Sequence, residues 1–473
     1  MPPHPFFING EWRMSSVIRE VRSPFDGAPA GEVCQATPAD IDEAIAAAAS
    51  AFKHSKGLAS FERSEVLSTA ADALRKRKPE LAELITRETG KPITYSRAEV
   101  DRSIFTFKTA AEEATRISGE VLPLDLNAGS RGRYAMVRRF PIGPVSAITP
   151  FNFPLNLVAH KVAPAIATGN TVVLKPSSNA PLVALLLGRI LDDCGLPKGC
   201  LNIVPCAGDE AGQLIEDERI KAISFTGSPA VGWPLKSRAG RKKVTLELGG
   251  NAGVIVEPDA DQVLACERIL SGGFANAGQS CIAVQRVYVH RKIFDRFVAE
   301  LVPKVAALPV GDPWDDRTVV GPMITENAAR QVEAWVGEAV GTGARVLTGG
   351  TRMGALFAPT VLTAVRPSMK VSCMEVFAPV ISVESYEEFT EAVDLVNASD
   401  FGLQAGVFTS NLHNIHEAYE RLDVGGVIIN DAPTYRMDHM PYGGVKASGF
   451  GREGIRYAME ELTELKLLAV NPL

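Results

Sequence analysis

The spacing of hydrophobic residues changes roughly a third of the way along the chain. Up to about residue 118 the spacing is helical, which predicts helices after Thr37-Pro38, from Val66 to Ile85 before Gly90, and over 98–117. From about residue 142, short β-branched runs alternate with helical stretches. The runs are 145–148, 171–174, 201–204, 222–225 and 244–246. This alternation predicts a parallel sheet covered by helices.

A second α/β unit is predicted from about residue 251 to 440, with strands over 286–289 and 426–429. The segment 121–139 has extended character and a turn at Asn127-Ala128-Gly129, which predicts a β-hairpin that needs a partner sheet. The tail, 465–470, reads as one last strand. The fold class is therefore α/β with two parallel-sheet units, and we expect an active site where they meet.

Composition narrows the class of protein. The chain has 473 residues, of which 46% are hydrophobic and 22% charged, as in a soluble globular protein. Its net charge of −6 argues against nucleic acid as a partner, and no apolar stretch is long enough to span a membrane. Seven cysteines without a C-x-x-C pair suggest neither disulfides nor a metal site. With no signal peptide visible, we expect a cytoplasmic location.

Polar residues follow several of the predicted strands, where parallel sheets bind ligands. Asn152 stands between aromatic residues and prolines, as either an oxyanion-hole donor or a turn residue. Lys175 ends a buried run and is either a cofactor ligand or a surface lysine. Glu247 precedes Gly249-Gly250 and is either a general base or part of a surface turn. The stretch Thr226–Gly232 joins a strand to a helix start, which can present backbone N–H groups to an anion.

Two further motifs carry candidate chemistry. In Gly278-Gln279-Ser280-Cys281, a glycine-flanked cysteine precedes a strand and is either an exposed nucleophile or an inert core thiol. A cysteine hydrolase remains open at this point, because a histidine partner can be distant in sequence. The motif Gly449–Gly454 fits G-x-G-x-x-G, but only 19 residues follow it, too few for a dinucleotide-binding βαβ unit.

Together, these motifs resemble those of the aldehyde dehydrogenase superfamily, and most of all the lactaldehyde dehydrogenases. The resemblance rests on seven motifs in the order of the family. They are Pro150–Pro154, Lys175–Ser177, Phe225–Ser228, Glu247–Gly250, Gly278–Cys281, Glu375–Pro379 and Pro441–Lys446.

The resemblance implies a role for each matching residue. Cys281 would attack the aldehyde, Asn152 and the Cys281 N–H would hold the oxyanion, and Glu247 would activate water. Glu375 would hold the nicotinamide ribose, Phe377 would orient the ring, and no metal is implied. The implied cofactor contacts are Thr149, Pro150, Phe151, Lys175, Ser177, Ser178, Gly227, Ser228, Val231, Leu248, Glu375 and Phe377.

Matches to particular subgroups of the family indicate the cofactor and the substrate. Ser178 stands where NAD-preferring relatives often carry glutamate, but no new arginine is close in sequence, so we expect NAD and keep NADP open. The stretch 435–446 favours a small hydrophilic aldehyde such as lactaldehyde or glycolaldehyde, ahead of a carboxylate- or phosphate-bearing semialdehyde. Arg102 and Arg436 match anion-binding positions and are either substrate ligands or ion-paired surface groups. Ser280 replaces the arginine that often precedes the nucleophile in relatives using dianionic aldehydes.

The resemblance also implies a domain plan. Residues 1–118 and 140–250 would bind NAD(P), 251–440 would be catalytic, and 119–139 with 455–473 would form an arm for a homodimer or homotetramer. Three rival functions are weaker. A coenzyme-A-acylating enzyme would usually lack Glu247. A structural protein would not need Asn152, Glu247, Cys281 and Glu375 together. A hydrolase without cofactor would leave Lys175 and Glu375 unused.

Overall fold

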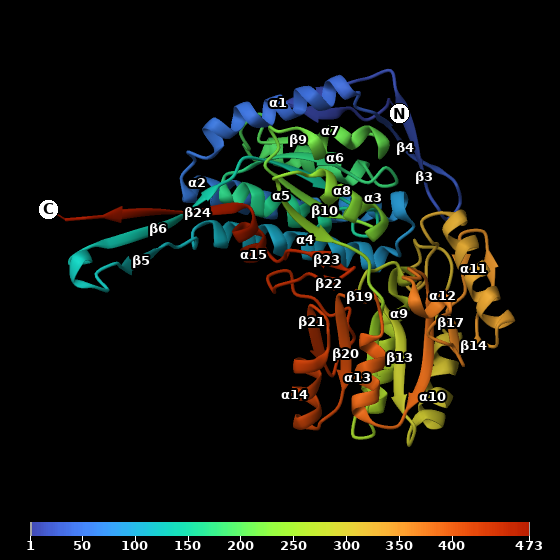
Figure 1. The fold of residues 1–473 in the computed structure, drawn as a ribbon. Coiled ribbons are helices and arrows are strands. Elements are labelled where there is room, and N and C mark those ends of the chain that lie inside the picture. Colours follow the sequence, from blue (N-terminus) through green and yellow to red (C-terminus); the bar gives the residue numbers. More distant parts are fainter. Residues whose placement is uncertain (1, 473) are drawn as a thin grey trace.

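The computed structural model describes residues 2–472, which form two α/β units joined at a central interface, with a thin arm projecting to one side (Figure 1). The first unit is built on an eight-stranded sheet whose strand order is β2-β1-β9-β8-β7-β10-β11-β23. Its strands are β1 (Phe6–Ile8), β2 (Glu11–Arg13), β7 (Pro144–Ile148), β8 (Thr171–Lys175), β9 (Leu201–Ile203), β10 (Ala222–Thr226), β11 (Lys243–Glu247) and β23 (Gly449–Phe450). Strands β7 to β11 pair in parallel, as the sequence predicts.

Helices cover both faces of this sheet, as burial of complete strands such as β7 and β8 requires. They are α1 (Pro38–Ser55), α2 (Ser60–Lys76), α3 (Lys78–Thr89), α4 (Ile93–Ala114), α5 (Asn156–Thr168), α6 (Leu182–Asp193), α7 (Gln213–Glu216) and α8 (Pro229–Arg238), with the short 3₁₀ turn η2 (Asp209–Gly212). Helix α1 starts where predicted, because Thr37 and Asp40 form a reciprocal capping box. The hairpin β3 (Ile18–Arg22) and β4 (Pro29–Cys34) also belongs to this unit.

One helical pattern of the sequence is divided in the structure. The apolar stretch from Val66 to Ile85 spans α2 and α3, which are separated at Arg77. Pro79 lies in the first turn of α3, where it can begin a helix but cannot continue one. Helix α4 runs from Ile93 to Ala114 and therefore begins and ends earlier than the predicted 98–117.

The second unit contains a seven-stranded sheet in the order β14-β17-β18-β13-β12-β20-β21, parallel except for the β14–β17 pair. Its strands are β12 (Ala252–Val256), β13 (Val284–His290), β14 (Arg345–Thr348), β17 (Thr360–Thr363), β18 (Val380–Tyr386), β20 (Gln404–Phe408) and β21 (Gly426–Ile429). Its helices are α9 (Gln262–Phe274), α10 (Phe294–Ala306), α11 (Glu326–Gly341), α12 (Lys370–Cys373), α13 (Phe389–Asn397) and α14 (Leu412–Arg421), and the 3₁₀ turn η3 (Ala275–Gly278) follows α9. Two small ribbons pair β15 (Arg352–Met353) with β16 (Leu356–Phe357) and β19 (Phe401–Gly402) with β22 (Val445–Lys446). The two-sheet α/β class predicted from the sequence is confirmed.

The arm is a three-stranded antiparallel sheet in the order β24-β6-β5. It combines the predicted hairpin, β5 (Glu120–Pro123) and β6 (Tyr134–Pro141) joined through the turn η1 (Ala128–Ser130), with the tail strand β24 (Thr463–Val470). The preceding helix α15 (Ile455–Glu461) packs on α5, and Ile455 and Met459 lie in the core of the first unit. Helix α15 therefore packs against the first unit, whereas β24 pairs with the hairpin.

Candidate active site

The two units face each other across the ends of their strands. The carboxyl ends of β7, β10 and β11 meet segments that lead into the amino ends of β12, β13 and β18. A cavity of about 570 Å³ lies between them. Cys281, Asn152, Glu247 and Glu375 all line this cavity, although 129 residues separate the first two in sequence (281 − 152). Folding thus brings together four side chains that the motifs single out separately.

Cys281 is held by a tight turn ahead of β13. Asn276, Ala277 and Gly278 all have left-handed backbone angles, with φ of 52°, 55° and 66°. A side chain at Gly278 would collide with the Ala378 carbonyl, so glycine is required where this turn meets the segment before β18. The Cys281 sulfur lies 3.1 Å from the Tyr442 hydroxyl.

The thiol of Cys281 is protonated at neutral pH in this environment. Burial raises its pKa to about 12, and the hydrogen bond with Tyr442 and the charge of Arg436 act in the opposite direction. Because the thiolate is the nucleophile, the site needs a proton acceptor before this sulfur can attack a carbonyl.

Asn152 presents its amide beside the segment that carries the cysteine. Its Nδ2 donates to the Gln279 carbonyl over 3.1 Å, which fixes the plane of the amide. An NH₂ group has two hydrogens, so the second one remains for a ligand. Oδ1 is buried and has no partner among the described residues. The asparagine is therefore buried at the cavity wall and is not an exposed turn residue.

Glu247 is the last residue of β11 and is almost completely buried. Neither carboxylate oxygen has a hydrogen-bond partner among the described residues. Burial and the nearby charge of Glu453 raise its pKa well above the usual value. A side chain at Gly443 would approach the Glu247 carboxylate, so a glycine next to Tyr442 leaves room for it. These features exclude the surface-turn interpretation of Glu247.

Glu375 and Phe377 precede β18 and line the same cavity. Glu375 accepts a hydrogen bond from the Gly250 N–H over 3.0 Å, and burial raises its pKa to about 7. Its carboxylate lies so close to Gly249 that any side chain there would collide with it. Phe377 has a left-handed φ of 53° and packs edge-on against Phe151, with ring centroids 6.0 Å apart.

Seven of the twelve implied cofactor contacts line the same cavity. They are Pro150, Phe151, Gly227, Ser228, Leu248, Glu375 and Phe377. The hydroxyls of Thr149 and Thr226 are buried without a partner among residues 2–472, which leaves donors and acceptors for a ligand at these strand ends. Ser228 occupies the N-cap position of α8 without a side-chain capping hydrogen bond, and Gly232 lets that helix approach Leu248, where a side chain would collide. Val231 is exposed on the first turn of α8.

The remaining contacts lie further along the same sheet edge. Lys175, at the end of β8, is 7% exposed, and its Nζ approaches only the Pro176 carbonyl, at 3.3 Å. It is thus not a surface lysine. Burial lowers its pKa, and the charge of Arg19 lowers it further. Ser177 accepts from the Asn179 N–H, and the Ser178 hydroxyl donates to the Cys206 carbonyl over 3.4 Å.

Arg102, Arg436 and Ser280 also line this cavity. Arg102 is ion-paired with Asp438 at 2.7 Å and is about one-third exposed. Arg436 is 7% exposed, pairs with Glu453 at 3.3 Å and stacks 3.6 Å over the Tyr442 ring. Both arginines are ion-paired, but Arg436 is buried and therefore not one of the surface groups considered from the sequence. Its Nε is buried and has no acceptor among the described residues.

The sequence analysis assigned no role to several residues around the cavity. Glu453 pairs with Lys161 at 2.9 Å; although burial would raise its pKa, Lys161, His160 and Arg436 lower it to about 2. His160 in turn contacts Asp438 at 2.8 Å. Glu453 belongs to the glycine-rich motif 449–454, whose β23 pairs with β11 beside Glu247. A charged residue within an otherwise buried helix, as at Lys161 in α5, is the signal that could have indicated this network.

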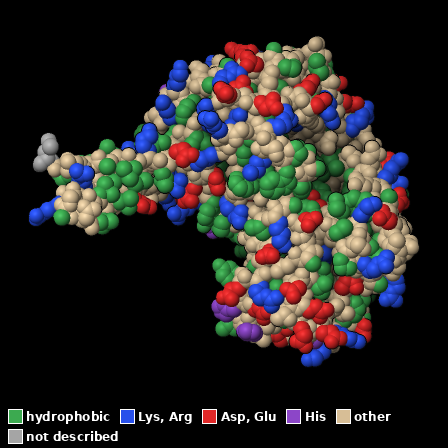
Figure 2. Space-filling model, in the orientation of Figure 1, with side chains coloured by type: hydrophobic (Ala, Val, Ile, Leu, Met, Phe, Trp, Pro, Cys, Tyr) green, Lys and Arg blue, Asp and Glu red, His purple; other side chains and the backbone are tan. Residues whose placement is uncertain are grey.

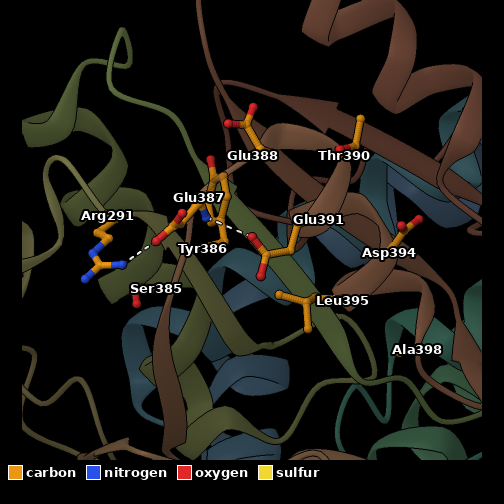
Figure 3. A pocket seen from close by; sticks show the side chains of 10 residues that line it. All are labelled: Arg291, Ser385, Tyr386, Glu387, Glu388, Thr390, Glu391, Asp394, Leu395 and Ala398. Atoms are coloured by element: carbon orange, nitrogen blue, oxygen red, sulfur yellow. Dashed lines mark hydrogen bonds and ion pairs between the residues drawn. The ribbon is translucent and has the colours of Figure 1, made fainter.

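A larger hollow of about 870 Å³ lies at the opposite, carboxyl end of β18 (Figure 3). It is open and acidic, with Glu387, Glu391 and Asp394 on its wall. Glu387 pairs with Arg291, and its N–H donates to Glu391 over 2.9 Å. The hollow contains none of the candidate catalytic groups.

The fold and the central cavity together define a two-sheet α/β enzyme with a partly buried thiol at the junction of its sheets. The sequence model of the aldehyde dehydrogenase family matches residues 12–468. A 3-sulfolactaldehyde dehydrogenase from Priestia megaterium is 47% identical over 466 residues, which cover 98% of this chain and 97% of that protein. A lactaldehyde dehydrogenase from Methanocaldococcus jannaschii is 40% identical over 470 residues, covering 98% and 100%.

Solved structures agree with the sequence matches. Aldehyde dehydrogenase 21 from Physcomitrella patens, in complex with the reaction product succinate, is 45% identical, with a TM-score of 0.97 over 99% of each chain. A glyceraldehyde-3-phosphate dehydrogenase from Methanocaldococcus jannaschii, complexed with NADP, is 40% identical, with a TM-score of 0.93 over 97% of this chain and 99% of that one. The chain belongs to the aldehyde dehydrogenase family, as its motifs predict.

Proposed function

We propose that this protein oxidises a short, polar aldehyde to the carboxylic acid with NAD or NADP, through a thioester on Cys281. The observation that carries the proposal is the convergence of Cys281, Asn152, Glu247 and Glu375 on one buried cavity. A thiol, an amide donor and an unpaired carboxylate are the groups that such an oxidation requires.

The residues of the cavity fit a nicotinamide cofactor. The unpartnered hydroxyls of Thr149 and Thr226 can bind it at the strand ends, and Glu375 can accept from its ribose hydroxyls. Gly227 and Gly249 keep side chains out of the groove, where each would collide with its neighbours. When bound, the nicotinamide accepts the hydride.

Cys281 carries the first half of the reaction. The Cys281 thiol passes its proton to water in the cavity, and Sγ forms a bond to the aldehyde carbon. The negative charge develops on the former carbonyl oxygen, where the second hydrogen of Asn152 Nδ2 can stabilise it. One such donor typically accelerates a reaction by about 10²–10³-fold. Loss of hydride from the adduct leaves an acyl thioester on Cys281.

Glu247 serves in the second half as the base for water. It removes a proton as the water oxygen attacks the thioester carbon, and the bond to Sγ breaks as the acid leaves. Its raised pKa suits this role, because a base is most effective when its pKa lies nearer the working pH. Glu247 also favours water over coenzyme A as the acyl acceptor.

Arg436 and Arg102 favour an aldehyde that carries one negative charge at the end away from the carbonyl. The unpartnered, buried Nε of Arg436 is a donor that a carboxylate or sulfonate would satisfy. Asp438 and Glu453 already neutralise much of the positive charge of the two arginines. A ligand with a single negative charge therefore suits the site better than a phosphate. The sulfolactaldehyde and succinate named for two relatives have this character. Lactaldehyde and glycolaldehyde are the neutral candidates from the sequence.

A substrate panel tests this assignment. We expect kcat/KM for 3-sulfolactaldehyde or succinic semialdehyde to exceed that for lactaldehyde by about tenfold or more, the value of one charge-assisted hydrogen bond. Arg102→Gln should reduce this preference. Arg97→Gln is the matched control, because Arg97 lies on the same helix α4 but pairs with Asp316 away from the cavity. A preference for lactaldehyde would show that the substrate is a neutral polar aldehyde. A preference for hexanal would refute both the charged and the neutral polar substrates.

We further propose that residues 1–118 and 140–250 form the cofactor domain and 251–440 the catalytic domain. The arm would join copies of the chain into a homodimer or homotetramer, because its strands expose apolar side chains (Figure 2). These include Val121, Leu465, Leu467 and Leu468, each more than half exposed. Seven free cysteines are consistent with a reducing cytoplasm. No helix within residues 2–472 is long and apolar enough to cross a membrane.

A further inference from the structure

The turn that carries Asn152 leads from β7 into helix α5, and its backbone needs partners from outside the helix. The first N–H groups of a helix have no carbonyl partners within it. Leu155 occupies the N-cap position of α5 and offers no side-chain hydrogen bond to them. The N–H of Leu157 donates to the Phe153 carbonyl over 2.9 Å. The N–H groups of Leu155 and Asn156 therefore need an acceptor from another element.

Glu99, on helix α4, supplies this acceptor. Its Oε1 accepts from the Leu155 N–H over 2.9 Å and from the Asn156 N–H over 3.1 Å. The side chain is almost completely buried, and its other oxygen forms an ion pair with Lys91, which is also buried. A carboxylate is favoured at the positive amino end of a helix, and a buried charge needs a partner. Glu99 thus fixes the start of α5.

Two further contacts hold the same turn. The Lys91 Nζ lies 4.0 Å from the centroid of the Phe153 ring, and Phe153 follows Asn152 directly in the chain. The Asn156 Oδ1 accepts from the Thr106 hydroxyl of α4 over 3.2 Å. Helix α4 and the segment just before it therefore hold residues 153, 155 and 156, all close to Asn152 in the chain.

The side chain of Asn152 has far less support of its own. Its one hydrogen-bond partner among residues 2–472 is the Gln279 carbonyl, ahead of Cys281. An oxyanion donor must lie about 2.7–3.1 Å from the charged oxygen, and a displacement of about 1 Å can lower a rate about 10²-fold. Because a single side-chain contact cannot fix this position, the backbone of the turn must fix it.

We propose that Glu99 is a positioning residue for the oxyanion donor Asn152, and that it acts through the N–H groups of Leu155 and Asn156. The inference rests on the proposed function, in which Asn152 stabilises the charge on the former carbonyl oxygen. Lys91 supplies the opposite charge that allows the Glu99 carboxylate to lie in the core.

Glu88 provides a matched comparison at another helix. It is equally buried, and it accepts from the N–H groups of Leu182 and Val183, over 2.6 and 3.0 Å, at the start of α6. It does not line the cavity of the candidate active site. Loss of the Glu88 acceptor should therefore lower the stability of the protein without displacing the oxyanion donor.

Two double variants separate the acceptor from the ion pair. Lys91→Met with Glu99→Ala removes the acceptor, whereas Lys91→Met with Glu99→Gln keeps an oxygen for the two N–H groups. Neither leaves an unpaired charge in the core. The readout is the rate of nucleotide reduction in a single turnover, with the full-length protein in excess over an aldehyde of the substrate panel and with saturating NAD or NADP. We expect the alanine variant to be slower than the glutamine variant by about tenfold or more.

The same comparison in an Asn152→Ala background shows whether Glu99 acts through Asn152. Asn152→Ala alone should lower the rate by about 10²–10³-fold. In this background the alanine and glutamine variants should differ by less than about twofold, because no donor remains to be displaced. Glu88→Ala and Glu88→Gln should differ in Tm, but by less than about twofold in the rate of nucleotide reduction.

An equal ratio of rates with and without Asn152 would overturn the inference, as would an equal loss of rate in the Glu88 variants. Glu99→Asp provides the same test if the alanine variant does not fold, because it keeps the charge but withdraws the carboxylate by one methylene. It should be slower than the wild-type protein by about threefold or more, and only when Asn152 is present.

The inference and the proposed function fail in different ways. If Asn152→Ala keeps the wild-type rate, or if no aldehyde of the panel is oxidised, the proposed function fails and the inference fails with it. If Asn152→Ala is slow and the Glu99 variants are not, the inference alone fails.

Discussion

Glu375 is proposed to bind the cofactor, and its ionisation lowers the stability of the cofactor-free protein. The variant Glu375→Gln cannot ionise and therefore measures this loss of stability. Burial raises the pKa of this carboxyl group to about 7 in the folded protein, from an ordinary value of 4.5. Because the folded pKa is raised, the folded state retains the proton between these values while the unfolded state releases it. Stability therefore falls as pH rises from about 4.5 to 7 and stays at the lower level above that.

The magnitude follows from the shift. A difference of 2.5 pKa units (7 − 4.5), at about 1.36 kcal/mol per unit, gives about 3 kcal/mol above pH 7. Water in the cavity makes this an upper value, since the carboxylate faces the cavity. Glutamine keeps the acceptor for the Gly250 N–H, yet it cannot ionise. With about 2.1 cal/mol/K of unfolding entropy per residue, the 473-residue chain should gain roughly 3 °C in Tm if it unfolds cooperatively.

The assay is thermal unfolding of the cofactor-free protein at pH 4.5, 6 and 8. We expect Glu375→Gln to match the wild-type Tm at pH 4.5 and to exceed it by up to roughly 3 °C at pH 8. Glu65→Gln, an exposed site on α2, is the control and should show no such pH-dependent gain. A Glu375→Gln protein that is no more stable at pH 8, or equally stabilised at all three values, would refute the reasoning.

Three other predictions concern the thiol, the groove and the arm. Tyr442→Phe removes the hydroxyl 3.1 Å from the Cys281 sulfur and should raise the thiol pKa further, slowing alkylation by iodoacetamide at pH 8 by about two- to tenfold; an unchanged rate would show that the contact is idle. Gly249→Ala would place a methyl group against the Glu375 carboxylate, so nucleotide affinity should fall at least tenfold while Cys281 still reacts with iodoacetamide; full affinity would contradict the assigned groove. Leu467→Glu on β24 should dissociate the assembly without lowering the Tm of the body, as sedimentation and calorimetry can measure; an unaltered mass would exclude this face of the arm as the interface.

Much of the fold could be predicted from the sequence because local patterns determine it. The buried runs that became β7, β8 and β10 are β-branched and uninterrupted, and they are bounded by turns and helical stretches. The boundary between α2 and α3 was missed because both helices continue one apolar pattern, while the single Pro79 sets the break. The partner strand of β6 in the arm is β24, which lies more than 300 residues further along the chain, so local patterns do not reveal this pairing.

The site was predictable where chemistry is concentrated in short motifs. Asn152, Glu247, Cys281 and Glu375 stand in such motifs, and the cavity brings them together. The contacts that tune them come from distant segments. Tyr442, for example, contacts the Cys281 sulfur although it lies 161 residues further along the chain, a separation that no sequence spacing reveals.

The ion pairs around Glu453 illustrate the same limit. Its glycine-rich motif was correctly excluded as a dinucleotide fingerprint, because β23 is a short antiparallel strand. The motif itself does not reveal that Glu453 pairs with Lys161, 292 residues earlier, or that its charge raises the pKa of Glu247. Such coupling depends on tertiary packing.

The central claim is that the acyl group is carried on Cys281. The most direct measurement is mass spectrometry of a Glu247→Gln variant mixed with NADP and an aldehyde substrate, with nucleotide reduction recorded in parallel. The account predicts about one equivalent of reduced nucleotide and a stable acyl adduct on the peptide containing Cys281, because the base that releases the acid is absent. Acylation of another residue, or turnover by a Cys281→Ser variant, would contradict it.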